Sequence, residues 1–194
     1  MSILSDTTLL RPHLLAQPGR SLVRDSHRKK AAVAAILRDG EAGIEVLLIR
    51  RADREGDPWS GQMALPGGRH DPTDSDLLHT AMRETEEEVG LTLPPSSLVA
   101  PLDDLEAVAR GVRTGLIIRP YVFFLEGSEP QLHPNHEVAE TLWTPLAPLH
   151  AGTRDTEYPY AMGEKVWKLP AWDINGRIVW GLTHRILSNL LERV

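Results

Sequence analysis

Apolar residues along the chain gather in short runs that are separated by polar segments rich in glycine and proline. The runs at 31–37 and 44–49 flank Asp39-Gly40, a dipeptide typical of turns, and this pattern predicts a β-hairpin. Further strands are expected near Val99, from Leu116 to Leu125, from Val138 to Trp143, and as two short strands between Val166 and Ile178.

Two segments have the 3.6-residue apolar periodicity of amphipathic helices. The first runs from about Ser75 to Val89 and stops at Gly90, the residue type most common just after a helix. The second covers about 180–193. Residues 1–30 are expected to form a short helical or irregular lead-in. Residues 50–68 are expected to form a long loop of the kind that is often functional.

The length and composition are those of an ordinary globular protein. The chain has 194 residues, of which 41% are hydrophobic and 25% charged, enough to build a core and no indication of disorder. Mixed strands with two or three helices predict an α/β fold with helices packed on a central sheet. We therefore expect one domain over residues 1–194.

Several classes of partner and chemistry are disfavoured by charge and composition. The net charge of −6 argues against nucleic acid or an anionic membrane as the main partner. The absence of cysteine excludes disulfides, thiolate catalysis and cysteine-type zinc sites. The first twenty residues lack the pattern of a secretory signal, so a cytoplasmic location is expected.

The first helix carries a cluster of acids in the stretch Arg83-Glu84-Thr85-Glu86-Glu87-Glu88. At about 100° per residue, Glu84, Glu87 and Glu88 fall on one arc beside an apolar stripe. Such a run is ordinarily a solvated face. However, two carboxylates about 6 Å apart repel by about 3 kcal/mol at an effective dielectric near 20, and the last helical turn disfavours negative charge. The cluster favours bound cations, and donors that are all oxygen indicate Mg²⁺ or Mn²⁺ rather than zinc.

The loop Leu65-Pro66-Gly67-Gly68 precedes this helix. Its two glycines permit backbone conformations that other residues resist, and exposed backbone groups there can reach a metal or a phosphate. Alone the sequence predicts only a turn. Because the loop comes a fixed number of residues before the acidic helix, the two segments together indicate a metal or phosphate site more strongly than the loop alone.

Together these segments, from Gly67 to Leu91, resemble the Nudix box. Its consensus is a glycine, five residues, a glutamate, seven residues, and then Arg-Glu-apolar-x-Glu-Glu-x-Gly-apolar. The second half matches at Arg83, Glu84, Glu87, Glu88, Gly90 and Leu91. Asp74 replaces the glutamate of the first half, and one extra residue separates it from Arg83. The resemblance implies the Nudix α/β/α sandwich with a central mixed sheet, in which the box forms a loop–helix–loop.

Three segments are similar to the coenzyme A diphosphatase branch of this family. They are Pro-Gly-Gly-Arg-His-Asp-Pro-Thr-Asp-x-Asp before the helix, Val179-Trp180-Gly181-Leu182-Thr183 near the C-terminus, and, in part, Leu47–Ala52 with Gly61. The last segment is about one residue longer than the branch's motif, and Arg54 is the nearest match to the second arginine of that motif.

The branch implies hydrolysis of coenzyme A, or of its derivatives, to 4′-phosphopantetheine and adenosine 3′,5′-bisphosphate. The alternative is a Nudix hydrolase that acts on another nucleoside diphosphate derivative, such as a dinucleotide cofactor or a sugar nucleotide. A non-catalytic module that senses a nucleotide is disfavoured, because such modules should have lost box acids that this chain retains.

The resemblance also implies roles for individual residues. Glu84, Glu87, Glu88 and the carbonyl of Gly67 are the expected ligands of Mg²⁺ or Mn²⁺. Arg83 is expected to orient a glutamate, although the same residue also fits an ordinary (i, i+4) ion pair with the glutamate four positions later.

The general base and the substrate contacts are less determined by the sequence. Glu84 is the first candidate for the base and Glu137 the second, and the latter is equally well explained as a surface residue, with Glu140 less favoured. The 3′-phosphate of coenzyme A requires basic residues near the site. The candidates are Arg50, Arg51, Arg54 and Arg69, each of which alone is more often a surface residue.

Two loop residues, Trp59 and Met63, are candidates for contact with the adenine or the pantetheine arm, although loop aromatics often only anchor a loop. The sequence leaves the oligomeric state open between a monomer and a homodimer. It also leaves open whether residues 1–30 cover the sheet, contribute to a dimer or close the site.

Overall fold

The computed structural model describes residues 3–17, 19–22, 29–109, 111–127 and 129–194. Its helices are α1 (Thr7–Ala16), α2 (Leu77–Val89), α3 (Leu146–His150) and α4 (Gly181–Leu191), with short 3₁₀ turns at Ile3–Ser5 and Pro95–Ser97. Its strands are β1 (Lys30–Gly40), β2 (Gly43–Arg51), β3 (Met63–Ala64), β4 (Gly67–Arg69), β5 (Leu98–Pro101), β6 (Leu105–Ala109), β7 (Val112–Leu125), β8 (Val138–Pro145), β9 (Asp155–Met162), β10 (Lys165–Ile174) and β11 (Arg177–Trp180).

The central sheet is mixed and has the order β3-β2-β1-β7-β5. Strands β1 and β7 run parallel, in register from Lys30 opposite Ile117 to Arg38 opposite Leu125. Every other described pairing in this sheet is antiparallel, including those of β4 with β1, β6 with β7 and β8 with β2. The hairpin expected from the first two apolar runs is confirmed as β1 and β2.

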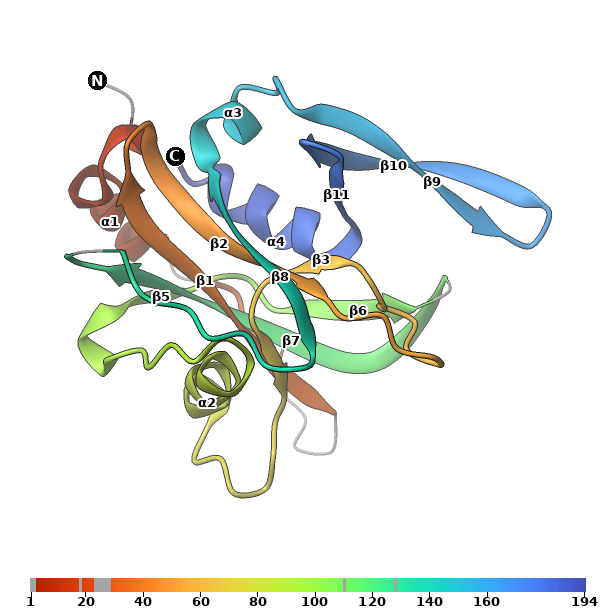
Figure 1. Ribbon diagram of the computed structural model, residues 1–194, viewed down its shortest axis with the longest axis horizontal. Helices are drawn as coiled ribbons and strands as arrows, with labels where there is room; N and C mark the ends of the chain where they lie inside the picture. The colour runs from red at the N-terminus through yellow and green to blue at the C-terminus, as the bar shows by residue number, and fades with distance from the viewer. Residues whose placement is uncertain (1–2, 18, 23–28, 110, 128) are drawn as a thin grey trace.

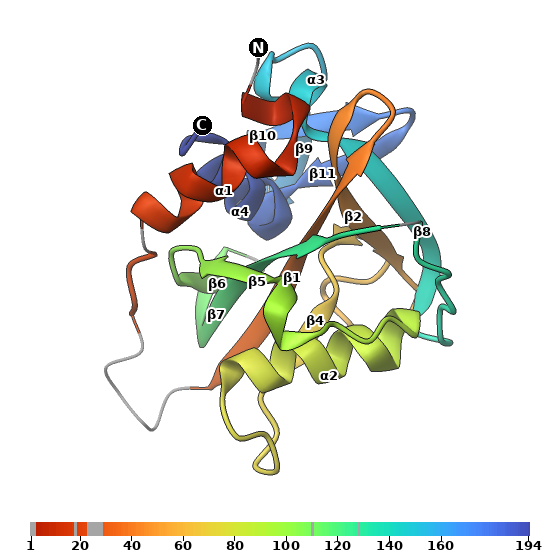
Figure 2. The ribbon, with the colours of Figure 1, turned by 90° about the vertical axis from the view of Figure 1, so that its left-hand side faces the viewer.

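Helices cover both faces of this sheet, as Figure 2 shows with α2 on one side and α1 and α4 on the other. On the α2 side, Leu77, Ala81 and Val89 pack with strand residues such as Phe123. On the other side, residues of α1, α3 and α4 share a second apolar cluster with the sheet. The central strand β1 is therefore buried on both faces, and this explains its continuous apolar sequence. The predicted α/β/α sandwich is confirmed.

A second sheet of three strands, in the order β11-β10-β9, extends beyond the main sheet (Figure 1). The sequence predicted two short strands between Val166 and Ile178, whereas β10 alone spans ten residues and pairs along its length with β9. Strand β9 was not predicted because most of its residues are exposed, so burial imposes little apolar pattern on it. The ring of Trp180 stacks on Tyr158, with ring centroids 4.0 Å apart, and helps to hold this hairpin.

Other differences from the predicted elements are small. The loop expected at 50–68 contains β3 and the beginning of β4, and β6 and α3 were not predicted. Helix α2 begins at Leu77, two residues later than expected, because the carboxylate of Asp76 accepts a hydrogen bond from the backbone N–H of His79 as an N-cap. Part of the expected lead-in is helix α1, while residues 1–2, 18 and 23–28 of it lie outside the described residues. Among the helices described, none has the length and apolar character needed to cross a membrane.

Candidate active site

The acids of α2 differ sharply in their surroundings. Glu88 is 3% exposed, and its Oε2 accepts a hydrogen bond of 2.9 Å from the backbone N–H of Gly67. Burial raises the pKa of the Glu88 carboxyl to about 7, because the hydrogen bond from Gly67 only partly offsets the lost hydration. Glu88 thus lies at the inner edge of the helix, buried against the loop that contains Gly67. A buried carboxylate in this position has a strong preference for a nearby cation.

The loop glycines allow the backbone of β4 to approach both β1 and α2 closely. Gly67 has a φ of 147°, and a Cβ atom added to it would lie 2.3 Å from the carbonyl oxygen of Ala32. A Cβ atom on Gly68 would lie 2.5 and 2.6 Å from the two carboxylate oxygens of Glu84. Glycine at Gly67 is therefore required by close packing against the backbone of β1 and by its own backbone conformation, whereas a Cβ atom at Gly68 would displace the carboxylate of Glu84.

Glu84 lies between this loop and the helix, with a side chain that is 17% exposed. Burial raises the pKa of its carboxyl, and the neighbouring Arg83 acts in the opposite direction. Glu87 is one turn further along and more open, with a side chain that is 54% exposed. The helix thus presents one buried, one half-buried and one exposed carboxylate.

Arg83 connects these acids to the loop that precedes the helix. Its guanidinium donates to Glu84 Oε1 and to Glu87 Oε2, each at 3.0 Å. On its other side, Nε and Nη2 donate to the two oxygens of Asp74 at 2.8 and 3.0 Å, and Nη2 also donates to the backbone carbonyl of Arg69 at 3.3 Å. The predicted (i, i+4) pair is present, and it is one part of a larger network.

Asp74 is the anchor of this network. Its side chain is fully buried and also contacts the Thr80 hydroxyl at 2.8 Å and His79 Nδ1 at 2.9 Å. The paired Arg83 guanidinium holds the pKa of Asp74 far below its usual range. The residue that departs from the box consensus therefore binds the box arginine in place of contacting the pocket.

The basic residues proposed from sequence separate into two groups. Arg51 and Arg69 line the same pocket as Glu84 and Glu88, whereas Arg50 and Arg54 do not. Arg51 Nη2 donates to Asp57 at 2.7 Å, and its Nε is buried with no hydrogen-bond partner in the described part of the chain.

The two arginines outside the pocket each face an acid. Arg50 lies 3.7 Å from Asp53, and Arg54 lies 3.4 Å from Glu137. Of the four arginines predicted to contact the substrate, Arg50 and Arg54 thus lie outside the lining of this pocket, and their role in substrate binding stays a prediction.

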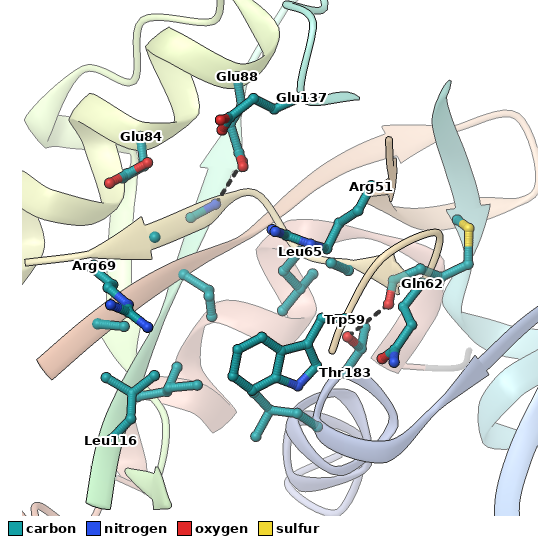
Figure 3. A pocket seen from close by; sticks show the side chains of 18 residues that line it. Arg51, Trp59, Gln62, Leu65, Arg69, Glu84, Glu88, Leu116, Glu137 and Thr183 are labelled. Atoms are coloured by element: carbon teal, nitrogen blue, oxygen red, sulfur yellow. Dashed lines mark hydrogen bonds between the residues drawn. The ribbon is translucent and has the colours of Figure 1, made fainter. Parts of the chain in front are cut away.

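Glu137 reaches the pocket from the loop before β8, where its carboxylate lies close to that of Glu88 (Figure 3). Its side chain is 45% exposed. Its backbone is fixed by two hydrogen bonds, from its own N–H to Asn135 Oδ1 and from the N–H of Ala52 to its carbonyl, both 2.8 Å. Glu140, the less favoured candidate, pairs instead with the guanidinium of Arg177.

Glu84, Glu88 and Glu137 line one hollow, which we call the acidic pocket. Its volume is about 300 Å³. Figure 3 shows Glu84, Glu88 and Glu137 on one side of it and Trp59 on the other. Besides the residues already named, its wall includes Ala31, Val33, Gln62, Met63, Leu65, Leu116, Ile118, Leu182 and Thr183. The sequence did not assign Gln62, Leu116 or Ile118 to a site, because nothing local distinguishes them from other core or loop residues.

Each acid of the helix already has a hydrogen-bond partner in this structure. Within the described residues, no three carboxylate or imidazole groups already converge as a metal cage. Glu84 and Glu87 are engaged by Arg83, and Glu88 by the N–H of Gly67. A buried and a half-buried carboxylate, both of raised pKa, beside an exposed third nevertheless provide the oxygen donors that hard divalent cations prefer.

Comparison with known proteins agrees with this geometry. The NUDIX domain model matches residues 28–162. The Nudix hydrolase NudL of Shigella flexneri is 31% identical over 98% of this chain and 92% of its own length. The chain therefore belongs to the Nudix family and is a Nudix hydrolase, an enzyme class that generally uses divalent metal ions.

A second relative bears on the branch. The human protein named mitochondrial coenzyme A diphosphatase NUDT8 is 33% identical over 85% of this chain and 70% of its own length. The resemblance to the coenzyme A diphosphatase branch is thereby confirmed. The fold is shared with a Nudix hydrolase of known structure from Alicyclobacillus acidocaldarius, which has a TM-score of 0.55 and 22% identity over 85% of this chain and 91% of that one.

Proposed function

We propose that this Nudix hydrolase cleaves the diphosphate bond of coenzyme A, or of its derivatives, to give 4′-phosphopantetheine and adenosine 3′,5′-bisphosphate. The proposal that coenzyme A is the substrate rests on the position of the C-terminal motif, Val179-Trp180-Gly181-Leu182-Thr183. Leu182 and Thr183 line the acidic pocket together with Glu84 and Glu88, although about 100 residues separate them in sequence. The name of the human relative points to the same substrate.

Glu84, Glu87 and Glu88, with the carbonyl of Gly67, are the proposed ligands of Mg²⁺ or Mn²⁺. A bound divalent ion supplies neutralisation of the diphosphate charge and lowers the pKa of a water molecule. Burial of Glu88 favours this arrangement, since a carboxylate with so little hydration is stabilised by a positive charge. The exposed Glu87 extends the same donor set toward solvent.

Side chains next to the proposed metal ligands fix the orientation of those ligands. Arg83 holds Glu84 and Glu87 in fixed orientations, and Asp74 in turn fixes Arg83. Glu84 is the first candidate for the general base, because its raised pKa brings it nearer to neutral pH, where proton transfer is most effective. Glu137, whose carboxylate lies close to that of Glu88, is the second candidate for the general base.

Arg51 and Arg69 are the proposed contacts for substrate phosphates. Both side chains line the acidic pocket, and a guanidinium group makes charge-assisted hydrogen bonds to anionic oxygens. Trp59 and Met63 line the same pocket and are proposed to contact the organic part of the substrate.

A direct test is incubation of the purified protein with coenzyme A and Mg²⁺ or Mn²⁺, with the products identified by mass. The two products named above are expected. Faster turnover of a sugar nucleotide or a dinucleotide cofactor in the same assay would reject coenzyme A as the substrate while leaving the reaction class in place. No turnover of any diphosphate would favour a non-catalytic nucleotide sensor.

The metal assignment has a matched control on the same helix. We expect Glu88→Gln to lower kcat by at least about a hundredfold, because the substitution removes a charged metal ligand without changing its shape. Glu86→Gln is the control, since Glu86 is exposed and, within the part of the chain that the structure describes, its carboxylate accepts a hydrogen bond from the Thr92 hydroxyl alone, at 3.0 Å. Full activity of the Glu88 variant would reject the proposed ligand set.

We further propose that residues 1–194 form one Nudix domain located in the cytoplasm, with a small nucleotide as its partner and with neither nucleic acid nor membrane. In support of one domain, Leu10 and Leu14 of α1 and Leu187 of α4 share an apolar cluster with the central sheet, although both helices lie outside the part matched by the family model.

A further inference from the structure

The loop between β2 and β3 contains an acid that has no part in the proposed chemistry. Asp57 does not line the acidic pocket, yet its side chain is only 14% exposed. An aspartate rarely loses this much hydration unless its charge is paired. The partners of Asp57 therefore indicate what the residue does.

Each carboxylate oxygen of Asp57 holds a residue of the pocket wall. Oδ2 accepts a hydrogen bond of 2.7 Å from Arg51 Nη2, and Oδ1 accepts one of 3.0 Å from the backbone N–H of Trp59. Burial raises the pKa of the Asp57 carboxyl, but these hydrogen bonds and the charge of Arg51 outweigh burial and leave the pKa below its ordinary value. Asp57 is therefore charged at neutral pH, and its contact with Arg51 is a charge-assisted hydrogen bond.

The backbone of the same loop connects Arg51 and Trp59 a second time. The N–H of Arg51 donates to the carbonyl of Gln62 at 3.0 Å, and the N–H of Gln62 donates to the carbonyl of Trp59 at 3.2 Å. The N–H of Ser60 donates to the carbonyl of Asp57, also at 3.2 Å. The loop thus folds back on the end of β2, and the Asp57 carboxylate is the side-chain link between the two pocket residues.

Arg51 has competing partners inside the acidic pocket. Figure 3 shows its side chain between Glu88 and Trp59. Burial has the largest effect on the pKa of the Glu88 carboxyl, and the charge of Arg51 acts against it. Without Asp57, the guanidinium would be drawn toward the carboxylates of Glu88 and Glu137. An arginine side chain also has several rotatable bonds, and fixing them before the substrate arrives removes an entropic cost from binding.

We propose that Asp57 is a positioning residue, which holds the guanidinium of Arg51 and the ring of Trp59 in the orientation that receives the substrate and keeps Arg51 away from the acids of the pocket. This inference rests on the proposed function, because it takes Arg51 and Trp59 to be substrate contacts. It applies to any nucleoside diphosphate derivative bound in the acidic pocket. Asp57 acts through these two residues and contacts neither the substrate nor the metal.

The test separates the two hydrogen bonds of Asp57. Asp57→Asn keeps an oxygen that accepts from the N–H of Trp59, but it presents to Arg51 an N–H₂ group, which cannot accept a hydrogen bond. With saturating Mn²⁺ we expect KM for coenzyme A to rise about fivefold and kcat to stay within about twofold, as for an interaction made equally with substrate and transition state. Glu55→Gln is the matched control. It removes one negative charge from an exposed position of the same loop, outside the pocket lining, so KM should stay within about twofold.

A double variant decides whether Asp57 acts through Arg51. In the Arg51→Ala background, Asp57→Asn should change KM by less than about twofold, because the group that it positions has been removed. Multiplication of the two single effects would overturn the inference, as would an unchanged KM in Asp57→Asn alone. If Asp57→Asn does not fold, Arg51→Lys is the second variant. It keeps the charge but not the fixed fork of donors, so KM should again rise about fivefold, and an unchanged KM would overturn the inference.

Failure of the proposed function is detected separately with a ligand that represents the nucleoside diphosphate part of the candidate substrates. Adenosine diphosphate is used, and its binding in the presence of Mn²⁺ is measured by calorimetry in the native protein, Asp57→Asn and Glu55→Gln. If coenzyme A is not hydrolysed, weaker binding in Asp57→Asn alone would reject coenzyme A as the substrate and support the positioning role. Equal binding in the three proteins would overturn the inference, whichever substrate is hydrolysed.

Discussion

Asp74→Asn tests whether the buried carboxylate of Asp74 supports both the fold and the position of the active-site acids. Asparagine has nearly the same shape but no charge, and its amide N–H₂ cannot accept from Arg83. In the native protein this fully buried side chain pairs with Arg83 through two hydrogen bonds and contacts Thr80 and His79. Breaking a buried ion pair by removing one partner costs about 3–5 kcal/mol. We expect a cost at the lower end of this range, because Arg83 keeps Glu84 and Glu87 as partners in the variant.

The expected loss in the free energy of unfolding is therefore about 3 kcal/mol at pH 7, measured by urea denaturation. For a chain of this length it corresponds to a decrease in Tm of about 6–12 °C. Asp71→Asn is the control, because Asp71 is exposed and, among the described residues, its carboxylate accepts hydrogen bonds from Thr73 alone, so little change in the urea midpoint is expected.

The same variant has a defined pH dependence. The pKa of Asp74 is lower in the folded state than in the unfolded chain, so its charge stabilises the fold above the unfolded pKa near 3.9 and loses this effect as the pH falls below it. The stability difference between the native protein and the variant should be complete at pH 7 and should shrink below about pH 4. A loss under about 1 kcal/mol at pH 7, or a difference that does not change in acid, would refute the reasoning.

Three further changes test other parts of the site. Gly68→Ala places a Cβ atom 2.4 Å from the carboxylate carbon of Glu84. Because the flexible side chain of Glu84 can move away, we expect kcat to fall by about 100-fold with little change in Tm, and an unchanged kcat would show that the position of Glu84 is not critical. Arg51→Ala should raise KM about tenfold through loss of a charge-assisted contact, whereas Arg50→Ala, outside the acidic pocket, should leave KM within about twofold; equal effects would contradict the separation of the arginines. Mn²⁺ at ten times its Kd should raise the free energy of unfolding by about 1.4 kcal/mol in the native protein and much less in Glu88→Gln, as measured by thermal denaturation; equal stabilisation of both would place the ion elsewhere.

The sequence predicted those features that depend on local spacing. Helix α2 and its end at Gly90 follow from periodicity and from a glycine with a φ of 68°, and the close approach of the acids follows from the helical repeat. The box and the C-terminal motif identified the family without reference to the fold.

Features that depend on distant contacts were not predicted. Nothing near Glu140 in sequence indicates that Arg177 will pair with it, and Arg54 meets Glu137 across 83 residues. The burial of Glu88 also required the sheet, because a helical repeat alone cannot show which edge of the helix faces a neighbouring strand. For the same reason the sequence could not separate Arg51 from Arg50, whose difference depends on which side of β2 faces the pocket.

The Thr183 hydroxyl donates a hydrogen bond of 3.0 Å to the backbone carbonyl of Met63, across 120 residues. This contact has a consequence for the order in which the enzyme matures during synthesis. A nascent chain that ends before α4 already contains every acid of the box, but it lacks the wall of the acidic pocket that Leu182 and Thr183 supply. The growing polypeptide is therefore expected to stay catalytically incomplete on the ribosome until its last helix has emerged and docked against β3.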